Sequence, residues 1–370
     1  MTSIHFAFTG FGNIAKTHMT ALRAMPIIKP LPLLPVLDTL VTRQPERYRA
    51  QAEAIGFRRV TDSAAEAAAD EQVHVLDICT PNSRHFEDVT AALDHGKAIY
   101  CEKPVTDSYE RTAQLLAETK RHPGLQEQLA FTFRYHPAVM RIRAILAEGI
   151  VGDILQCSIS YRRSGYLDPQ RPMSWRLQGG LSGGGATSDL AVHALDMIRH
   201  WFGDYKEISG HARAHVRTRP ESAGSETRVP SEVDDWAMMN YSTESGISGT
   251  VEVSRIALGS EAFEIRIVGT HGSITADLER DQSPTVHLVR GSTPVLPVPA
   301  TLDLLPGDKA TMGIAVDTHF AALHHYIQRY AGEDRYPGLA PRLADGGHVE
   351  YWIDRVLRNS GQAADGEAEQ

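Results

Sequence analysis

The feature that most constrains this chain is an apolar run that ends in two closely spaced glycines. Ile4 to Thr9 reads IHFAFT, Gly10-x-Gly12-x-x-Ala15 follows directly, and Met19 and Leu22 continue the apolar positions at helical spacing. This pattern predicts a strand, a tight turn and a helix. In a dinucleotide-binding turn the first glycine permits the bend, the second lets a pyrophosphate approach, and a small third residue packs helix against strand. Taken alone, the motif also fits an ordinary strand-turn-helix corner.

The first third of the chain repeats this alternation of strands and helices. Strands are expected at Pro35 to Thr42, Val73 to Thr80 and Ala98 to Cys101, with helices at Pro45 to Ile55 and from Phe86 to Leu93. Alternation of this kind predicts a parallel sheet with helices on both faces. We therefore expect an α/β, Rossmann-type dinucleotide-binding domain over residues 1–124.

The rest of the chain has longer segments of alternating polarity. They indicate an α+β domain over residues 125–360, built on a large, mostly antiparallel open sheet. Its expected strands are Gln128 to Tyr135, Ile154 to Arg162, Trp236 to Tyr241, Gly249 to Ile256 and Phe263 to Val268. Its expected helices are Pro137 to Glu148, Ser188 to Trp201, Thr318 to Tyr330 and Gly347 to Leu357. Residues 361–370 have too few apolar side chains to offset the entropy lost on ordering, and we expect a disordered tail there.

Composition narrows the possible partners. No apolar run approaches the ~20 residues that a membrane span requires, and no signal peptide is recognisable. The three cysteines show no paired spacing, which favours a reducing cytoplasm and argues against a disulfide framework or a zinc site. A net charge of −9 without a dense Lys/Arg stripe argues against nucleic acid. A small molecule is therefore the expected partner, with no membrane association.

The end of the second strand bears on the choice of cofactor. NAD sites usually carry an acidic residue there, which bonds the ribose hydroxyls. Here the strand ends in Thr42 and Arg43. Arg43 can pair with a 2′-phosphate, which favours NADP over NAD. Asp38 is the candidate acid if the strand ends earlier, and Arg43 is equally compatible with a solvated surface charge.

Two further segments carry chemistry. Cys101-Glu102-Lys103-Pro104 follows a strand, so Lys103 should lie at the carboxyl edge of the sheet, where it can stabilise an alkoxide or pass a proton. Asp189 and His193 stand four apart on an expected helix, which places both on one face. Histidine can remove a hydroxyl proton near neutral pH, and the preceding run Gly183 to Gly185 would leave room for a ligand. A simple contact along the helix face is the alternative for this pair.

Together these motifs resemble the family of glucose-fructose oxidoreductase, inositol dehydrogenase and rhizopine catabolism proteins (Gfo/Idh/MocA). That family has GxGxxA after the first strand, Glu-Lys-Pro after a later one, and a helix with Asp-x-x-x-His preceded by glycines. All three occur here in order. Ala191 departs from a glycine often found between the Asp and the His, and the proline-rich stretch Pro26 to Pro35 unsettles the alignment at Thr42 and Arg43.

The resemblance implies an NAD(P)-dependent oxidoreductase acting on a secondary hydroxyl or carbonyl of a sugar, inositol or related polyol, commonly as a homodimer or homotetramer. Lys103, Asp189 and His193 match the catalytic positions, with His193 as proton acceptor and Lys103 as electrostatic stabiliser. The expected cofactor contacts are Gly10, Phe11, Gly12, Asn13, Ile14, Thr42, Arg43, Thr80, Pro81, Asn82, His85, Glu102 and Lys103. The expected substrate contacts are Lys103, Arg134, Tyr135, Tyr166, Trp175, Arg176, Asp189 and His193.

Two other functions fit parts of the sequence. The family includes a dinucleotide-binding repressor, so a non-catalytic regulator of sugar metabolism is the main alternative, although the presence of both Lys103 and His193 argues against it. A metal-dependent enzyme could use Asp189, His193, Asp196 and His200 on one helical stripe. No HExxH motif or cysteine cluster supports that stripe, so no metal is expected.

Overall fold

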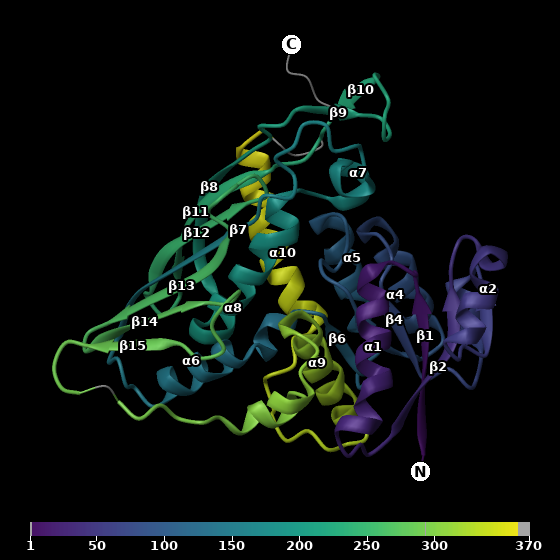
Figure 1. The fold of residues 1–370 in the computed structure, drawn as a ribbon, viewed down its shortest axis with the longest axis horizontal. Helices are drawn as coiled ribbons and strands as arrows, with labels where there is room; N and C mark the ends of the chain where they lie inside the picture. The colour runs from purple at the N-terminus through teal and green to yellow at the C-terminus, as the bar shows by residue number, and fades with distance from the viewer. Residues whose placement is uncertain (1, 293, 362–370) are drawn as a thin grey trace. The chain divides into compact units, whose positions relative to one another are not determined.

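The computed structural model describes residues 2–292 and 294–361, so nearly all of the tail expected at residues 361–370 lies outside the described residues (Figure 1). The chain divides into two compact units. The first comprises Met1–Thr106, Glu110–Tyr135 and Ala300–Gly347, and the second comprises Asp107–Tyr109, His136–Pro299 and His348–Gln370. The sequence had suggested one division at residue 124, whereas in the structure the first unit also takes up a late segment of the chain.

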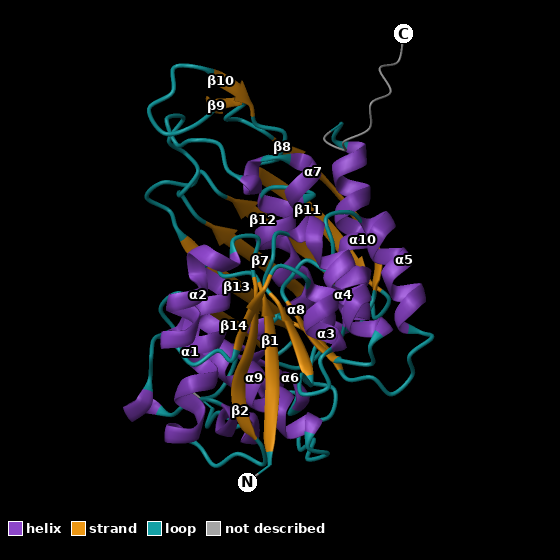
Figure 2. Cartoon of the chain, turned by 90° about the vertical axis from the view of Figure 1, so that its right-hand side faces the viewer, coloured by secondary structure: helices purple, strands orange, loops and turns teal. Residues whose placement is uncertain are grey.

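The first unit is built on a six-stranded parallel sheet in the order β3-β2-β1-β4-β5-β6. Its strands are β1 Ser3–Thr9, β2 Leu34–Val41, β3 Arg59–Thr61, β4 Val75–Ile78, β5 Ala98–Cys101 and β6 Glu127–Leu129. Helices lie on both faces, α1 and α2 on one and α3, α4 and α5 on the other (Figure 2). These helices are α1 Asn13–Ile28, α2 Pro45–Ala54, α3 Ala64–Ala69, α4 His85–Asp94 and α5 Tyr109–Thr119. The chain reverses its direction across the sheet between β1 and β4, which is where doubly wound folds bind ligands.

Two predictions for the segment around residue 130 were wrong. Gln128 to Tyr135 was expected to be a strand of the second sheet, but β6 pairs in parallel with β5, and a 3₁₀ turn follows at Thr132–Tyr135. The alternation of apolar residues in this segment imitates a strand. The chain turns because the Arg134 amide bonds the Phe131 carbonyl rather than a neighbouring strand.

Helix α9 (Ile314–Tyr330) packs against α1 in the first unit. Gln126 Nε2 donates to the Tyr326 carbonyl at 2.9 Å, which ties the helix to the segment before β6. The helix was predicted from Thr318 onward and assigned to the second domain. An amphipathic pattern predicts the helix but does not say which surface it covers, so its membership of the first unit was not foreseen.

The second unit contains a seven-stranded sheet in the order β15-β14-β13-β7-β12-β11-β8. Its neighbours are antiparallel except β12 and β7, which confirms the mostly antiparallel sheet. The strands are β7 Ile154–Arg162, β8 Tyr205–Arg213, β11 Trp236–Thr243, β12 Ser248–Ser254, β13 Ala262–Gly269, β14 Gly272–Asp277 and β15 Thr285–Leu288. A short ribbon joins β9 Thr218–Pro220 and β10 Arg228–Pro230.

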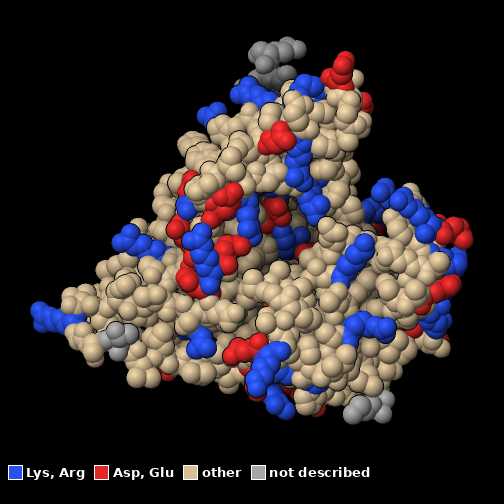
Figure 3. Space-filling model, viewed as in Figure 1, with Lys and Arg blue, Asp and Glu red and all other residues tan. Residues whose placement is uncertain are grey.

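One helix of the second unit, α8, packs on a strand of this sheet. Helix α8 packs on β7 and α6, and its residues 192–198 are all buried. The helices are α6 Pro137–Ala147, α7 Gly179–Ser182, α8 Val192–Phe202 and α10 Leu343–Asn359, which begins in the first unit. No helix within the described ranges is long and apolar enough to cross a membrane. Acidic and basic side chains are interspersed on the face drawn in Figure 3.

Candidate active site

The glycine turn after β1 has the geometry that its sequence predicts. Gly10 has φ +96°, and a Cβ at this position would lie 2.8 Å from the Cys79 carbonyl oxygen, so only glycine fits. Gly12 precedes α1 and is open to solvent, which leaves the first amides of the helix accessible to an anion. Ala15 is fully buried and lets the helix approach the strand. Phe11, Asn13 and Ile14 lie at the same turn.

The end of β2 resolves one ambiguity about the cofactor site. The strand continues to Val41, so Asp38 lies within it and is fully buried. Its carboxylate accepts hydrogen bonds from Arg58 at 2.8 and 3.2 Å and lies 2.9 Å from His5 Nδ1. Asp38 is thus committed to contacts inside the first unit and is not placed to bind a ribose. Thr42 follows the strand half-buried, and Arg43 is exposed beside it.

The turn after β4 is braced by a buried histidine. His85 Nε2 lies 3.0 Å from the Thr80 carbonyl oxygen, and Nδ1 lies 2.8 Å from the Pro104 carbonyl oxygen. The ring joins the turn after β4 to the turn after β5. His85 was expected among the cofactor contacts, but it is fully buried beneath these turns. Pro81 is half-buried, and Asn82 begins the short 3₁₀ turn at Asn82–Arg84.

Glu102 and Lys103 leave the sheet at the same edge as the glycine turn. The Cys79 amide donates to the Thr9 carbonyl at 2.9 Å, and the Glu102 amide donates to the Ile78 carbonyl at 2.9 Å. The ends of β1, β4 and β5 are therefore in register. Lys103 is half-buried, and its amide donates to Glu102 Oε2 at 3.2 Å. The structure thus brings the predicted glycine turn and Lys103 to one edge of the first unit's sheet.

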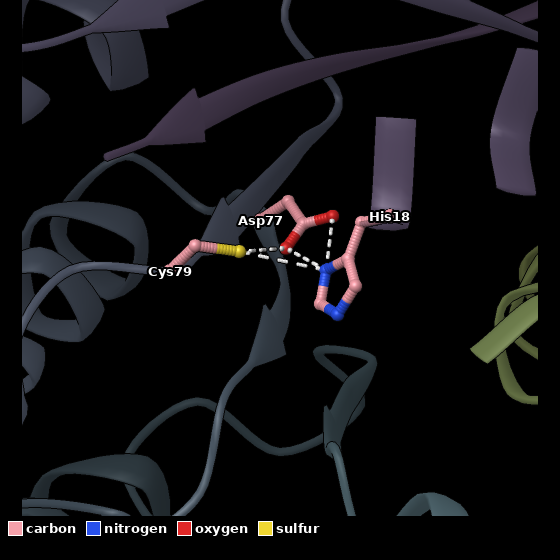
Figure 4. Close-up of side chains that lie close together, drawn as sticks. All are labelled: His18, Asp77 and Cys79. Carbon is pink, nitrogen blue, oxygen red and sulfur yellow. Dashed lines mark hydrogen bonds and ion pairs between the residues drawn. The ribbon is translucent and has the colours of Figure 1, made fainter. Parts of the chain in front are cut away.

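A buried polar cluster lies beneath this edge (Figure 4). His18 Nδ1 is 2.9 and 3.2 Å from the two carboxylate oxygens of Asp77, and His18 Nε2 is 3.2 Å from Glu102 Oε1. Cys79 Sγ lies 3.2 Å from Asp77 Oδ1. The His319 ring lies beside His18, with 4.8 Å between the ring centroids.

Electrostatics sets the protonation state of this cluster. Burial opposes a charge on His18, but Asp77 outweighs it and raises the pKa of His18 well above its usual value. Burial likewise opposes ionisation of Glu102, yet the neighbouring positive charge of His18, whose Nε2 lies 3.2 Å from Oε1, holds the pKa of Glu102 at about 2. Burial, with the neighbouring His18 charge, lowers the pKa of His319 to about 3. His18 is therefore an imidazolium between two carboxylates, and His319 is neutral.

The cluster's residue types could in principle hold a metal. His18, Asp77 and Cys79, and His18, Glu102 and His319, each place ligand atoms within 4.8 Å of one another. Two ligands of a tetrahedral zinc ion stand about 3.4 Å apart, whereas His18 and Asp77 approach to 2.9 Å. Burial also raises the pKa of the Cys79 thiol, which disfavours the thiolate that a metal would need. The cluster is a hydrogen-bonded network, and within the described ranges the stripe from Asp189 to His200 forms no such group.

In the second unit, the glycine run packs closely against backbone. Asp234 accepts hydrogen bonds from the Gly185 amide, the Thr187 amide and the Thr187 hydroxyl, each at 2.8 Å. A Cβ on Gly185 would overlap the Asp234 carbonyl, and one on Gly183 would overlap the Asp107 carbonyl. The glycines were expected to leave room for a ligand. In the structure, the space that their missing side chains leave is filled by the backbone of Asp107 and Asp234.

The predicted helix that carries Asp189 and His193 begins with a π-helical turn. Thr187–Ala191 is π-helical, and α8 continues from Val192. Asp189 lies in the π turn with its side chain 34% exposed, and His193 lies in the first turn of α8, buried. The helix predicted over Ser188 to Trp201 is therefore present, with a π-helical rather than an α-helical first turn. Single π turns are frequent at functional sites because they re-aim side chains.

Asp189 is held by an arginine that was not among the predicted site residues. Arg255 Nη2 donates to Asp189 Oδ2 at 3.0 Å, and its guanidinium carbon lies 4.7 Å from the centre of the Tyr166 ring. Arg171 lies near the same ring, at 4.2 Å. Arg255 directly follows β12 and is buried. The sequence does contain a sign of this pair, an arginine at the end of an apolar strand. A buried guanidinium needs an acidic partner.

The remaining predicted substrate residues fall in both units. Tyr135 is fully buried in the first unit with its hydroxyl 3.0 Å from His325 Nδ1, and Arg134 is buried there with an ion pair to Asp345 at 3.3 Å. The 3₁₀ turn directs both into the unit's own core. Trp175 and Arg176 lie in the second unit, with the guanidinium 4.3 Å from the indole centre.

Two family models match successive parts of the chain. Residues 4–126 match "Oxidoreductase family, NAD-binding Rossmann fold", and residues 139–275 match "GFO/IDH/MocA C-terminal domain". The chain belongs to the Gfo/Idh/MocA family. It is accordingly an oxidoreductase with an NAD-binding Rossmann domain, which confirms the family and fold expected from the motifs.

Other Gfo/Idh/MocA proteins show how far the similarity extends. Levoglucosan dehydrogenase of Pseudarthrobacter phenanthrenivorans is 32% identical over 76% of this chain and 75% of its own length. The scyllo-inositol 2-dehydrogenase (NAD(+)) of Bacillus subtilis is 27% identical over 67% of this chain and 69% of its own. A structure of levoglucosan dehydrogenase in complex with NADH and L-sorbose superposes with a TM-score of 0.86 at 28% identity, covering 98% of this chain and 97% of that one.

Proposed function

We propose that this chain interconverts a secondary hydroxyl and the corresponding carbonyl of a sugar, inositol or related polyol, with a nicotinamide dinucleotide as the hydride partner. The observation that carries the proposal is the meeting of the glycine turn and Lys103 at the carboxyl edge of one parallel sheet. The names of the relatives support the substrate class, since they include dehydrogenases of levoglucosan and scyllo-inositol.

The first unit would hold the cofactor. The proposed contacts are Gly10 to Ile14 at the pyrophosphate, Thr42 and Arg43 at the adenosine ribose, and Thr80 to Asn82 with Glu102 near the nicotinamide. When bound, the nicotinamide accepts or returns a hydride at C4. Arg43 is exposed at the end of β2, whereas the Asp38 carboxylate is buried and bonded to Arg58. The two residues that follow the strand, Thr42 and Arg43, therefore include a cation and no carboxylate. On this ground we propose that NADP is accepted and preferred over NAD.

Three side chains would take part in the chemistry. His193 removes the proton of the reacting hydroxyl while the hydrogen on the same carbon leaves as hydride, which makes the carbonyl. The Lys103 ammonium stabilises the negative charge that develops on the oxygen. Asp189, fixed by Arg255, accepts hydrogen bonds from substrate hydroxyls. Tyr166, Trp175 and Arg176 are the proposed further substrate contacts in the second unit.

The test is an absorbance screen at 340 nm with the purified chain. NAD and NADP would each be offered with monosaccharides, anhydrosugars, inositols and sugar acids, and reduced cofactor with the corresponding ketoses. The proposal expects turnover with at least one polyol or its carbonyl form. NADH or NADPH binding without turnover over the whole panel would overturn it in favour of a dinucleotide-sensing regulator.

Location and assembly are proposed with the activity. Cys79, Cys101 and Cys157 are all buried and form no disulfide, which fits a reducing cytoplasm. We propose a homodimer or homotetramer, as the family resemblance implies. Light scattering of the purified chain would measure its mass, and a monomer at micromolar concentration would contradict this part of the proposal.

A further inference from the structure

His18 joins two carboxylates that lie on different strand ends of the first unit. Its Nδ1 bonds Asp77 on β4, and its Nε2 faces Glu102 just after β5 at 3.2 Å. His18 is fully buried on α1, with the Tyr100 ring edge-on at 5.4 Å and His319 of α9 on another side. These are strong constraints on the orientation of one imidazole ring.

Glu102 connects the His18 ring to the backbone of Lys103. Its side chain is 10% exposed, so its charge depends on a buried partner. Oε1 faces His18, and Oε2 accepts the hydrogen bond from the Lys103 amide at 3.2 Å. The two oxygens of one carboxylate thus connect the imidazolium to the residue that projects from the edge of the sheet.

Opposite charges lie next to one another in this network. Glu102 is ionised, His18 carries one positive charge, and His319 is neutral. Cys79 remains a thiol that contacts Asp77. The Lys103 ammonium is the further positive charge near Glu102. Without His18, the carboxyl groups of Asp77 and Glu102 would share a buried site, and Glu102 Oε1 would lose its charged neighbour.

We propose that His18 is a positioning residue for the reaction: it anchors on Asp77, fixes the Glu102 carboxylate, and through that carboxylate sets the backbone of Lys103. The inference rests on the proposed function of Lys103. His18 would not touch substrate or cofactor. Its loss would lower the rate by misplacing a catalytic group, since errors of about 1 Å can cost up to 100-fold in rate.

Two variants separate this role from simple core packing. The amide nitrogen of His18→Gln can occupy the Nε2 position and donate to Glu102. That of His18→Asn matches Nδ1 and can donate only to Asp77. Both variants remove the positive charge and the aromatic ring. We expect His18→Asn to lower kcat by about 10-fold or more, with KM within about 3-fold, and His18→Gln to retain clearly more activity at a similar Tm.

Hydrogen exchange gives a readout that does not need the substrate. The Lys103 amide should exchange faster in His18→Asn than in His18→Gln, measured by mass spectrometry on a peptide spanning Cys101 to Pro104. If His18→Asn does not fold, Asp77→Asn replaces it, because it removes the negative charge that anchors the ring and should also speed exchange at Lys103. Equal exchange rates and equal kcat in the two His18 variants would overturn the proposal.

The two proposals fail in different ways. Should the unaltered chain oxidise no polyol, the proposed function fails while the exchange rates still decide whether His18 fixes the Lys103 backbone. Should Lys103→Ala abolish turnover while both His18 variants match the unaltered chain in kcat and exchange, the proposed function stands and the positioning role fails.

Discussion

Arg255 and Asp189 form a 3.0 Å ion pair that links the end of β12 to the π-helical turn before α8. The arginine side chain is 3% exposed and the aspartate side chain 34% exposed, so the cation of the pair is buried while the carboxylate is partly accessible. A carboxylate held in this way has a fixed orientation. Asp189 is therefore prepared to accept hydrogen bonds from hydroxyl groups of a ligand.

This pair predicts the outcome of removing the cation. Arg255→Met should raise KM for the polyol and lower kcat/KM by roughly 10- to 100-fold, because a buried charge partner is lost. Arg255→Lys, which keeps the charge but not the planar donor geometry, should fall in between. Steady-state kinetics on the substrate found in the screen measures both. Unchanged kcat/KM in a folded Arg255→Met protein would show that the pair has no role in substrate binding.

Arg43 predicts a change in cofactor preference. Its guanidinium is exposed at the end of β2, where it can meet a 2′-phosphate. Arg43→Ala should weaken NADPH binding about 10-fold or more and leave NADH binding within about 2-fold, since removing one charge-assisted contact costs on the order of 1.5–3 kcal/mol. Fluorescence titration with both reduced cofactors gives the comparison. An equal loss for both would refute the phosphate contact.

Substitution of Gly10 by alanine should impair cofactor binding, whereas the same substitution at a control glycine, Gly96, should not. Gly96 also has positive φ, +62°, but has open space around its position. Gly96→Ala should cost about 1 kcal/mol of unfolding free energy for the left-handed backbone alone. Gly10→Ala should cost more, because its Cβ would meet the Cys79 carbonyl, and should weaken NADH binding at least 10-fold. Chemical denaturation and titration of both variants check this. The idea fails if the two variants behave alike.

The buried His136 should make the folded protein less stable at acidic pH. Its Nδ1 accepts from the Ala138 amide at 3.2 Å, and its Nε2 donates to the Leu278 carbonyl at 3.1 Å, so only the neutral ring makes both bonds. Burial lowers the pKa of His136 to about 4. The folded state therefore takes up the proton later than the unfolded state, whose pKa is about 6.5. The contribution is complete above pH 6.5 and declines as pH falls toward 4.

The size of this effect follows from the difference in pKa. Lowering the pH from 8 to 5 should remove about 2 kcal/mol of unfolding free energy through His136. His136→Asn keeps an acceptor for the helix cap but cannot titrate, so its stability should depend less on pH over that range. Urea unfolding at pH 5 and pH 8 measures the slopes. Identical slopes for the two proteins would contradict the assignment.

Much of the fold was predictable because apolar runs and glycines mark it directly. The bounds of β5 and β7 agree with the predicted strands, since a buried strand leaves an uninterrupted or strictly alternating apolar pattern. The return of α9 to the first unit was not predictable, because its apolar face fits either unit. The π turn at Asp189 was also missed, since a four-residue spacing is read by default as α-helix.

The motifs of the proposed site can be recognised in the sequence, whereas the residues that hold them in place cannot. Lys103, Asp189 and His193 stand in recognisable patterns, but Arg255, Asp234 and His18 act through partners far away in the sequence. One signal was available: Asp77 interrupts the apolar strand VHVLDICT, and a buried carboxylate requires a partner. Which residue supplies that partner depends on packing, and the sequence pattern does not name it.

The central claim is that this chain moves a hydride with His193 as the proton acceptor. The most direct measurement is the turnover of His193→Ala on the best substrate, compared with its affinity for reduced cofactor. We expect kcat to fall about 100-fold or more while cofactor affinity stays within about 2-fold of the unaltered chain. Turnover near that of the unaltered chain would contradict the claim.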